Sequence, residues 1–366
     1  MPCIYDNRPT PKAPKQVKQS QVTIPEESTE TTPSFTIESP INMEIPETRE
    51  RRLLEVKLMQ QWITKTAMTL PTVRDPVQRE IMTVLCPELA IQNDGLLYSI
   101  YAFAALHVAM TTNDHPVKEE AVEAHHRYLG MALRTHQTDI SNMGQQNAEM
   151  VCLTSIFLRS CYHATLQERC LSPYTPPTQW LRMMRGSCDI AKMALESVGH
   201  DEGSIINKLN RPKPDMMDLY TVFNPKNAEG LCHLLRRKQD NVETEPWDLQ
   251  TQDAYSHTIR YIGGMLTGFL NGESLAEVTK RVVVFSMTAS DRFIALLEDR
   301  QPRAMVILAH FFAMMAKLRN IWWIGDTGRR EIRTIQSVLS EDWDDLMSWP
   351  LMALNEDPME IGTIPI

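Results

Sequence analysis

The sequence lacks the features that mark a metal module, a disulfide framework or a membrane anchor. Its seven cysteines are scattered, and no two have the spacing of a Cys-x-x-Cys pair. No signal peptide is recognised, so reduced thiols are expected, as in nuclear or cytosolic proteins. No uninterrupted apolar run reaches the ~18–20 residues that a membrane span needs, so no membrane partner is expected. The net charge of −9 argues against a nucleic-acid surface along the whole chain.

Catalytic motifs are missing as well. The chain contains no GxGxxG, GxxxxGK[ST], GxSxG or HExxH sequence. One acidic cluster, formed by Glu341, Asp342, Asp344 and Asp345, invites comparison with the Mg²⁺ motifs of α-helical isoprenoid enzymes. The second motif of those enzymes is absent, and acids at a helix N-terminus stabilise it by about 0.3–1 kcal/mol each. We therefore expect no enzyme activity and no cofactor, and a Mg²⁺-dependent enzyme is the least favoured alternative.

Histidines also give no metal site. His107 lies in an apolar run and is expected to be a hydrogen-bonded core residue. His125 and His126 are neighbours on a predicted helix, where adjacent side chains point about 100° apart, so they do not readily face one metal ion.

Helical periodicity begins at Thr48. Leu54, Leu58 and Trp62 recur at i, i+4 spacing, and residues 96–110 are apolar nearly all round, which predicts a central buried helix. With 43% apolar residues and little sign of strands, the expected fold is all-α. We predict about nine to twelve helices in a single domain over residues 48–355, followed by a tail over 356–366.

Residues 1–47 differ from the rest. They are rich in Pro, Ser, Thr and Glu and contain almost no aromatics, so they are expected to form a disordered arm. The beginning of this arm is basic and has four cations, Arg8, Lys12, Lys15 and Lys18.

The rest of the chain is expected to pack around residues 302–350, which we call the signature segment. It predicts an apolar helix over 304–318 with one buried face, followed by Trp322-Trp323. Gly325 and Gly328 can adopt positive φ at low cost, so the chain can turn sharply between the two helices. A basic amphipathic helix over 329–339 should keep its arginines in water. Trp343, Trp349 and Pro350 close the segment, and its four tryptophans are expected to dock on the fold.

The signature segment resembles the C-terminal part of the fungal-specific transcription-factor domain of binuclear zinc-cluster regulators, in the branch with the sterol uptake control proteins. Thr327 stands where members of that family often have Trp. The resemblance implies a nuclear transcriptional regulator of sterol or secondary-metabolite genes, acting as a homodimer or with a related regulator. In some relatives the helical domain binds a small apolar ligand. The matching residues are Pro302, Arg303, Ala309, His310, Trp322, Trp323, Gly325, Gly328, Trp343, Trp349 and Pro350.

The first residues carry a second resemblance. Cys3-Ile4-Tyr5-Asp6 is similar to the end of a zinc cluster, with Cys3 as its last cysteine and the four basic residues as an arm along the DNA backbone. The resemblance implies five further cysteines before Cys3 to hold two Zn²⁺ ions, and the sequence has none there. Two alternatives stay open. The sequence starts inside a longer DNA-binding protein, or the chain is a co-regulator without DNA binding that acts through protein partners.

Overall fold

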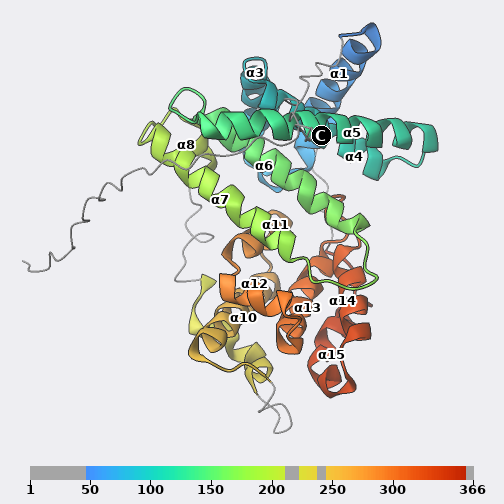
Figure 1. Cartoon of the computed structure of the whole chain (residues 1–366), viewed down its shortest axis with the longest axis vertical. Coiled ribbons are helices and arrows are strands. Elements are labelled where there is room, and N and C mark those ends of the chain that lie inside the picture. Colours follow the sequence, from blue (N-terminus) through green and yellow to red (C-terminus); the bar gives the residue numbers. More distant parts are fainter. Residues whose placement is uncertain (1–46, 211–221, 237–244, 360–366) are drawn as a thin grey trace, which may run out of the picture. The chain divides into compact units, whose positions relative to one another are not determined.

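The structure is a computed structural model that describes residues 47–210, 222–236 and 245–359 (Figure 1). Within these ranges the chain forms fourteen α-helices, with shorter 3₁₀- and π-helical turns and no strand. The all-α prediction is confirmed. No helix in the described ranges is long and apolar enough to cross a bilayer.

The first helices form two runs that pack on each other. Thr48 caps the first run, because its Oγ1 accepts a hydrogen bond from the Arg51 amide at 3.2 Å. The buried Trp62 indole donates to the Met82 carbonyl at 2.9 Å, which ties the π-helical turn of one run to that of the other. The elements are α1 (Arg49–Gln61), η1 (Trp62–Thr66), η2 (Ala67–Thr69), η3 (Pro71–Arg74), α2 (Pro76–Glu80), η4 (Ile81–Leu85) and α3 (Cys86–Ala90).

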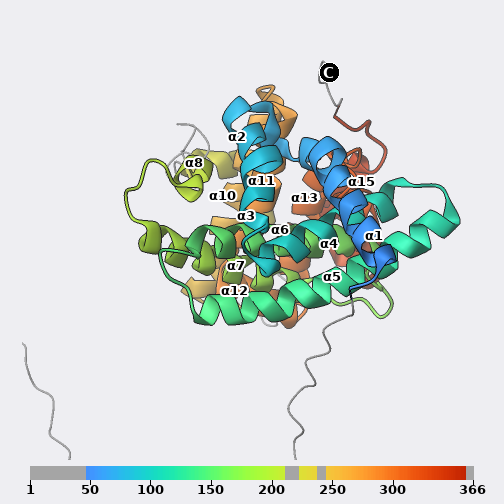
Figure 2. The same ribbon diagram turned by 90° about the horizontal axis from the view of Figure 1, so that it is seen from above.

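Four long helices follow, and α4 is the most apolar of them. It runs beside α5 and also packs against α6, while α6 packs against α7 (Figure 1 and Figure 2). Twelve residues of α4 are buried, as its apolar sequence predicted. The bounds are α4 (Asp94–Thr111), α5 (His115–Ser141), α6 (Ala148–Thr165) and α7 (Thr178–Val198).

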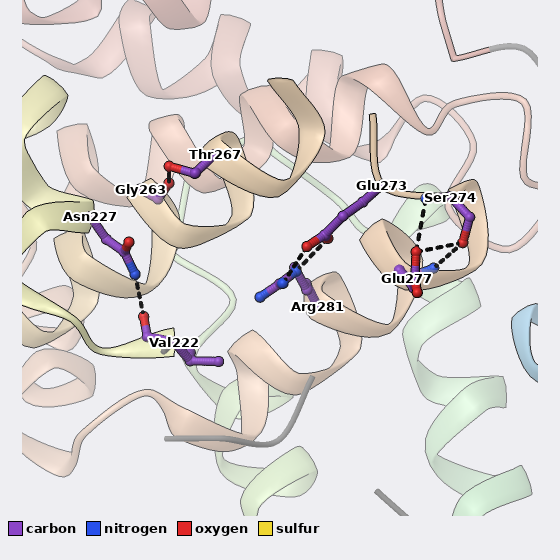
Figure 3. Close-up of polar contacts among 8 residues, drawn as sticks. All are labelled: Val222, Asn227, Gly263, Thr267, Glu273, Ser274, Glu277 and Arg281. Atoms are coloured by element: carbon purple, nitrogen blue, oxygen red, sulfur yellow. Dashed lines mark hydrogen bonds and ion pairs between the residues drawn. The ribbon is translucent and has the colours of Figure 1, made fainter. Parts of the chain in front are cut away.

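The next part packs closely because its glycines allow it. A Cβ at Gly263 would lie 1.8 Å from the Asn227 carbonyl oxygen, and one at Gly268 would lie 2.4 Å from Glu273 Oε2. The Glu273 carboxylate pairs with Arg281, whose Nε donates at 2.7 Å (Figure 3). Glycine is therefore required where α10 meets η6 and the start of α11. The elements are α8 (Ile205–Asn210), η6 (Pro225–Leu235), α10 (Leu249–Leu270), α11 (Leu275–Thr288) and α12 (Asp291–Glu298).

The chain ends in α13 (Pro302–Lys317), α14 (Thr327–Val338), η8 (Glu341–Trp343) and α15 (Asp344–Ala353). Helix α13 packs against α10, α12, α14 and α15. Residues beyond α15 contact the end of α13 and the turn that follows it. The Met359 amide donates to the Lys317 carbonyl at 2.8 Å, and Arg319 donates to the Glu356 carbonyl at 2.9 Å.

Candidate functional site

Helix α13 is the buried axis of the signature segment. Every residue from Arg303 to Ala316 is buried, so the expectation of one buried face was too narrow. Other helices cover α13 on several sides, and His310 is fully buried with its Nδ1 2.8 Å from the Val306 carbonyl. Burial lowers the pKa of His310 to about 4, which keeps the imidazole neutral.

The two glycines of the turn have different roles. Gly325 has a φ of 49° and lies against the Gln167 side chain, so it is the residue that turns the chain. Gly328 does not use this freedom, since it lies in the first turn of α14 without a positive φ. There a Cβ would lie 2.4 Å from the Phe312 carbonyl oxygen and 2.6 Å from the Ala316 amide nitrogen. Gly328 thus lets α14 approach the backbone of α13.

Trp322 joins the signature segment to the N-terminal helices. Its Nε1 donates to Thr69 Oγ1 at 2.8 Å, and its ring stacks on His107 with centroids 4.6 Å apart. Gln167 donates to its carbonyl at 2.8 Å. His107 also has its Nδ1 2.8 Å from Thr66 Oγ1, as expected of a hydrogen-bonded core histidine. Burial lowers the pKa of His107 to about 4, so the stack forms with a neutral ring.

Trp323 points into the core instead. It is 5% exposed, and its ring contacts His163 edge-on with centroids 5.0 Å apart. His163 in turn contacts Trp180 at 5.4 Å. Because His163 is fully enclosed, its pKa is lowered to about 3. The adjacent tryptophans therefore bind different helices.

A buried carboxylate fixes α14. Glu331 is 1% exposed and forms a bidentate ion pair with Arg169, and it also accepts a hydrogen bond from the Tyr174 hydroxyl at 3.1 Å. Burial and the neighbouring carboxylate raise the pKa of Tyr174, which stays protonated. Arg330 donates to the Arg169 carbonyl at 3.0 Å. The loop between α6 and α7 is thereby tied to the signature segment.

A buried guanidinium fixes the start of α13. Arg303 is 1% exposed, pairs with Glu245 through two nitrogens and donates to the Leu234 carbonyl. Its guanidinium carbon lies 5.3 Å from the Trp247 ring centroid and 5.2 Å from that of Trp343. One side chain therefore joins η6, the residues before α10, α13 and η8.

The remaining members of the segment lie at its end. Trp343 is 6% exposed, and the half-buried Trp349 lies 5.3 Å from the His310 ring. Pro350 lies inside α15, which continues to Ala353. Met347, Pro350 and Ala353 are buried at i, i+3 and i+6, and this packing outweighs the missing amide.

Two further expectations on α14 and η8 have different outcomes. Arg333 is exposed, whereas Arg329 and Arg330 are half-buried, so the basic face is only partly in water. Arg330 donates to the Arg169 carbonyl in the α6–α7 loop, and Arg329 forms an ion pair with Asp326. The acidic cluster lies at a helix start, with Asp344 accepting from Gln336, and the described ranges hold no group of three or more His, Cys, Asp or Glu side chains suited to a metal ion.

Cys3, Arg8, Lys12, Lys15 and Lys18 lie outside the described residues. The polar partners Gln167, Arg169 and Glu245 were not predicted. They come from segments 58 to 162 residues away from the groups that they bind, where no local pattern signals the contact.

Two curated proteins are similar to this chain over most of its length. A "Zn(2)-C6 fungal-type transcription factor" of Gibberella zeae is 26% identical over 321 residues, which cover 82% of this chain and 61% of that protein. The "Zn(2)-C6 fungal-type transcription factor afumD" of Aspergillus fumigatus is 26% identical over 318 residues, 85% of this chain and 76% of the relative. The chain thus spans less than two thirds of the Gibberella protein. No protein-family model matches it.

Proposed function

We propose that this chain is the helical regulatory domain of a fungal transcriptional regulator of the zinc-cluster type. The observation that carries the proposal is its similarity, over 82% and 85% of the chain, to two proteins named as Zn(2)-C6 fungal-type transcription factors. The all-α fold and the buried signature segment are consistent with it. Neither relative is named as an enzyme, which supports the expectation that the chain performs no catalysis.

The finer parts of the proposal rest on the resemblance of the signature segment. They are a nuclear location, control of sterol or secondary-metabolite genes, pairing with a second copy or a related regulator, and binding of a small apolar ligand. Contact with DNA belongs to a form that carries a zinc cluster ending at Cys3, with Arg8, Lys12, Lys15 and Lys18 along the phosphates.

A tethering experiment tests the regulatory role. The full chain is fused to an unrelated DNA-binding domain in a fungal host that carries the cognate reporter gene, and transcription is compared with that of the DNA-binding domain alone. We expect the fusion to change transcription. The matched control is the Arg303→Ala fusion, which leaves the Glu245 carboxylate buried without its guanidinium and should lose the effect. Equal transcription from the fusion and from the DNA-binding domain alone would contradict the proposal.

The co-regulator alternative needs a different measurement. Zinc content and DNA binding are determined on the protein purified from its native host. Two Zn²⁺ per chain and specific DNA binding indicate a complete regulator. No zinc, no DNA binding and co-purification with another regulator indicate the co-regulator. Light scattering on the same sample tests the proposed dimer.

A further inference from the structure

A surface pocket of about 550 Å³ opens beside the signature segment. It lies between the loop 171–174, the residues that join α12 to α13, and the C-terminal half of α14. Its volume falls within the roughly 300–1,000 Å³ of small-molecule sites. Among the described residues no Asp or Glu lines it. The wall includes Leu171, Met305 and Val338 on its apolar side, and Thr334, Ser337 and Arg300 among its polar groups.

Arg300 occupies a backbone position that disfavours its side chain. Its amide donates to the Leu297 carbonyl, and the Gln301 amide donates to the Leu296 carbonyl, both at 2.9 Å. This pair of bonds defines the glycine-type end of helix α12, in which the residue after the C-cap is left-handed. Arg300 has a φ of 53°, the only positive φ of a non-glycine residue in the described ranges. Glycine or asparagine usually occupies this left-handed position, and the left-handed backbone is unfavourable for arginine.

The guanidinium of Arg300 has no partner in the part of the chain that the structure describes. No hydrogen bond or ion pair joins it to another described side chain. Arg169 and Arg303 differ from it in this respect, because each of them pairs with a buried carboxylate. The hydroxyls of Thr334 and Ser337 are already used as donors, since Thr334 donates to the Arg330 carbonyl and Ser337 to the Thr334 carbonyl. Arg300 is the charged group in the lining, and its guanidinium is free to bind an anion.

We propose that this pocket binds an amphipathic organic anion, with its apolar body on the Leu171, Met305 and Val338 wall and its carboxylate or phosphate on Arg300. The strained backbone is retained because the side chain at this position binds the ligand. Tyr174 also lines the pocket and donates to Glu331 of α14, so a bound ligand contacts the network that fixes the signature segment. A consequence for transcription would rest on the proposed regulatory function, whereas binding itself does not.

Calorimetric titration of the full chain tests the proposal with three probes of one chain length, octanoate, octyl phosphate and octanol. The first two separate a carboxylate from a phosphate ligand, and the third lacks the charge. We expect at least one anion to bind about tenfold or more tightly than octanol, because a charged hydrogen bond is lost with the alcohol.

Variants locate the site. Arg300→Gly should weaken binding of that anion by about tenfold or more and should melt no lower than the wild type, since glycine suits the left-handed backbone. Val338→Asp should also weaken binding, because it adds a negative charge to the wall. Arg333→Ala, at an exposed arginine of α14 outside the lining, should bind as the wild type does. Absence of saturable anion binding, equal affinity for octanol, or unchanged affinity of Arg300→Gly would each overturn the proposal.

Discussion

Replacing Gly328 with alanine tests how the signature segment packs. The new Cβ would lie 2.4 Å from the Phe312 carbonyl oxygen and 2.6 Å from the Ala316 amide nitrogen. Both atoms belong to the backbone of α13, which is enclosed along most of its length, so no side-chain rotation relieves the contact. Overpacking costs typically 1–3 kcal/mol, and the helix propensity of alanine offsets up to about 1 kcal/mol. Because a buried helix has to shift, we place the cost at the upper end of that range and expect a net loss of about 2 kcal/mol.

Urea unfolding followed by far-ultraviolet circular dichroism measures this loss as a lower midpoint. The matched control is Gly186→Ala in the middle of α7, where nothing lies within 4 Å of the added Cβ. The control should stabilise the protein by about 0.5–1 kcal/mol, since alanine replaces glycine in a helix without a clash. If Gly328→Ala unfolds at the same or a higher urea concentration than the wild type, α14 does not approach the α13 backbone as described.

Three further changes are predicted. Glu331→Ala should cost about 3–5 kcal/mol in urea unfolding, because it leaves the guanidinium of a buried ion pair without its carboxylate; a loss below about 1 kcal/mol would refute this. Because the pKa values of His107 and His163 are lowered to about 4 and about 3, the unfolded chain binds more protons below pH 6.5. The contribution of these two histidines to stability should therefore be constant above about pH 7 and fall from pH 6.5 towards pH 4, by up to about 1.4 kcal/mol per pH unit for each histidine, and a midpoint that does not change between pH 7 and pH 4 would count against buried neutral rings. Asp344→Asn with Asp345→Asn should leave reporter activity unchanged, and Mg²⁺ should bind neither form in calorimetry; Mg²⁺ binding that the double variant abolishes would revive the enzyme alternative.

The helical fold could be predicted because its information is local. The apolar run of α4 and that of α13 each exceed what an exposed helix could carry, so both had to be buried. The same run could not show how many neighbours α13 has, because full enclosure depends on helices that are distant in sequence. The position of Pro350 inside α15 is likewise not a local property, since burial of the α15 face compensates for the missing amide.

The contacts of the site were less predictable for a physical reason. Gly325 and Gly328 give the same sequence signal, yet one turns the chain and the other admits a neighbouring backbone. Arg303 could be matched to a family pattern, but its partner Glu245 lies 58 residues earlier in a segment broken by prolines. The conformation of Arg300 could not be predicted. Only about a third to a half of helices end with a left-handed residue, and the sequence before Pro302 has no glycine or asparagine to mark one.

The buried residues of the signature segment and the exposed residues beside it have different roles. Arg303, Trp323 and Gly328 are enclosed, and their contacts are with other helices of the same chain. Such residues fix the arrangement of α13, α14 and α15, and they would do so in regulators with different ligands and target genes. A property particular to this protein has to reside in groups that reach solvent. Arg300 is such a group, exposed in a pocket against the signature segment and without a partner among the described residues, so its substitution tests ligand specificity while the buried network stays intact.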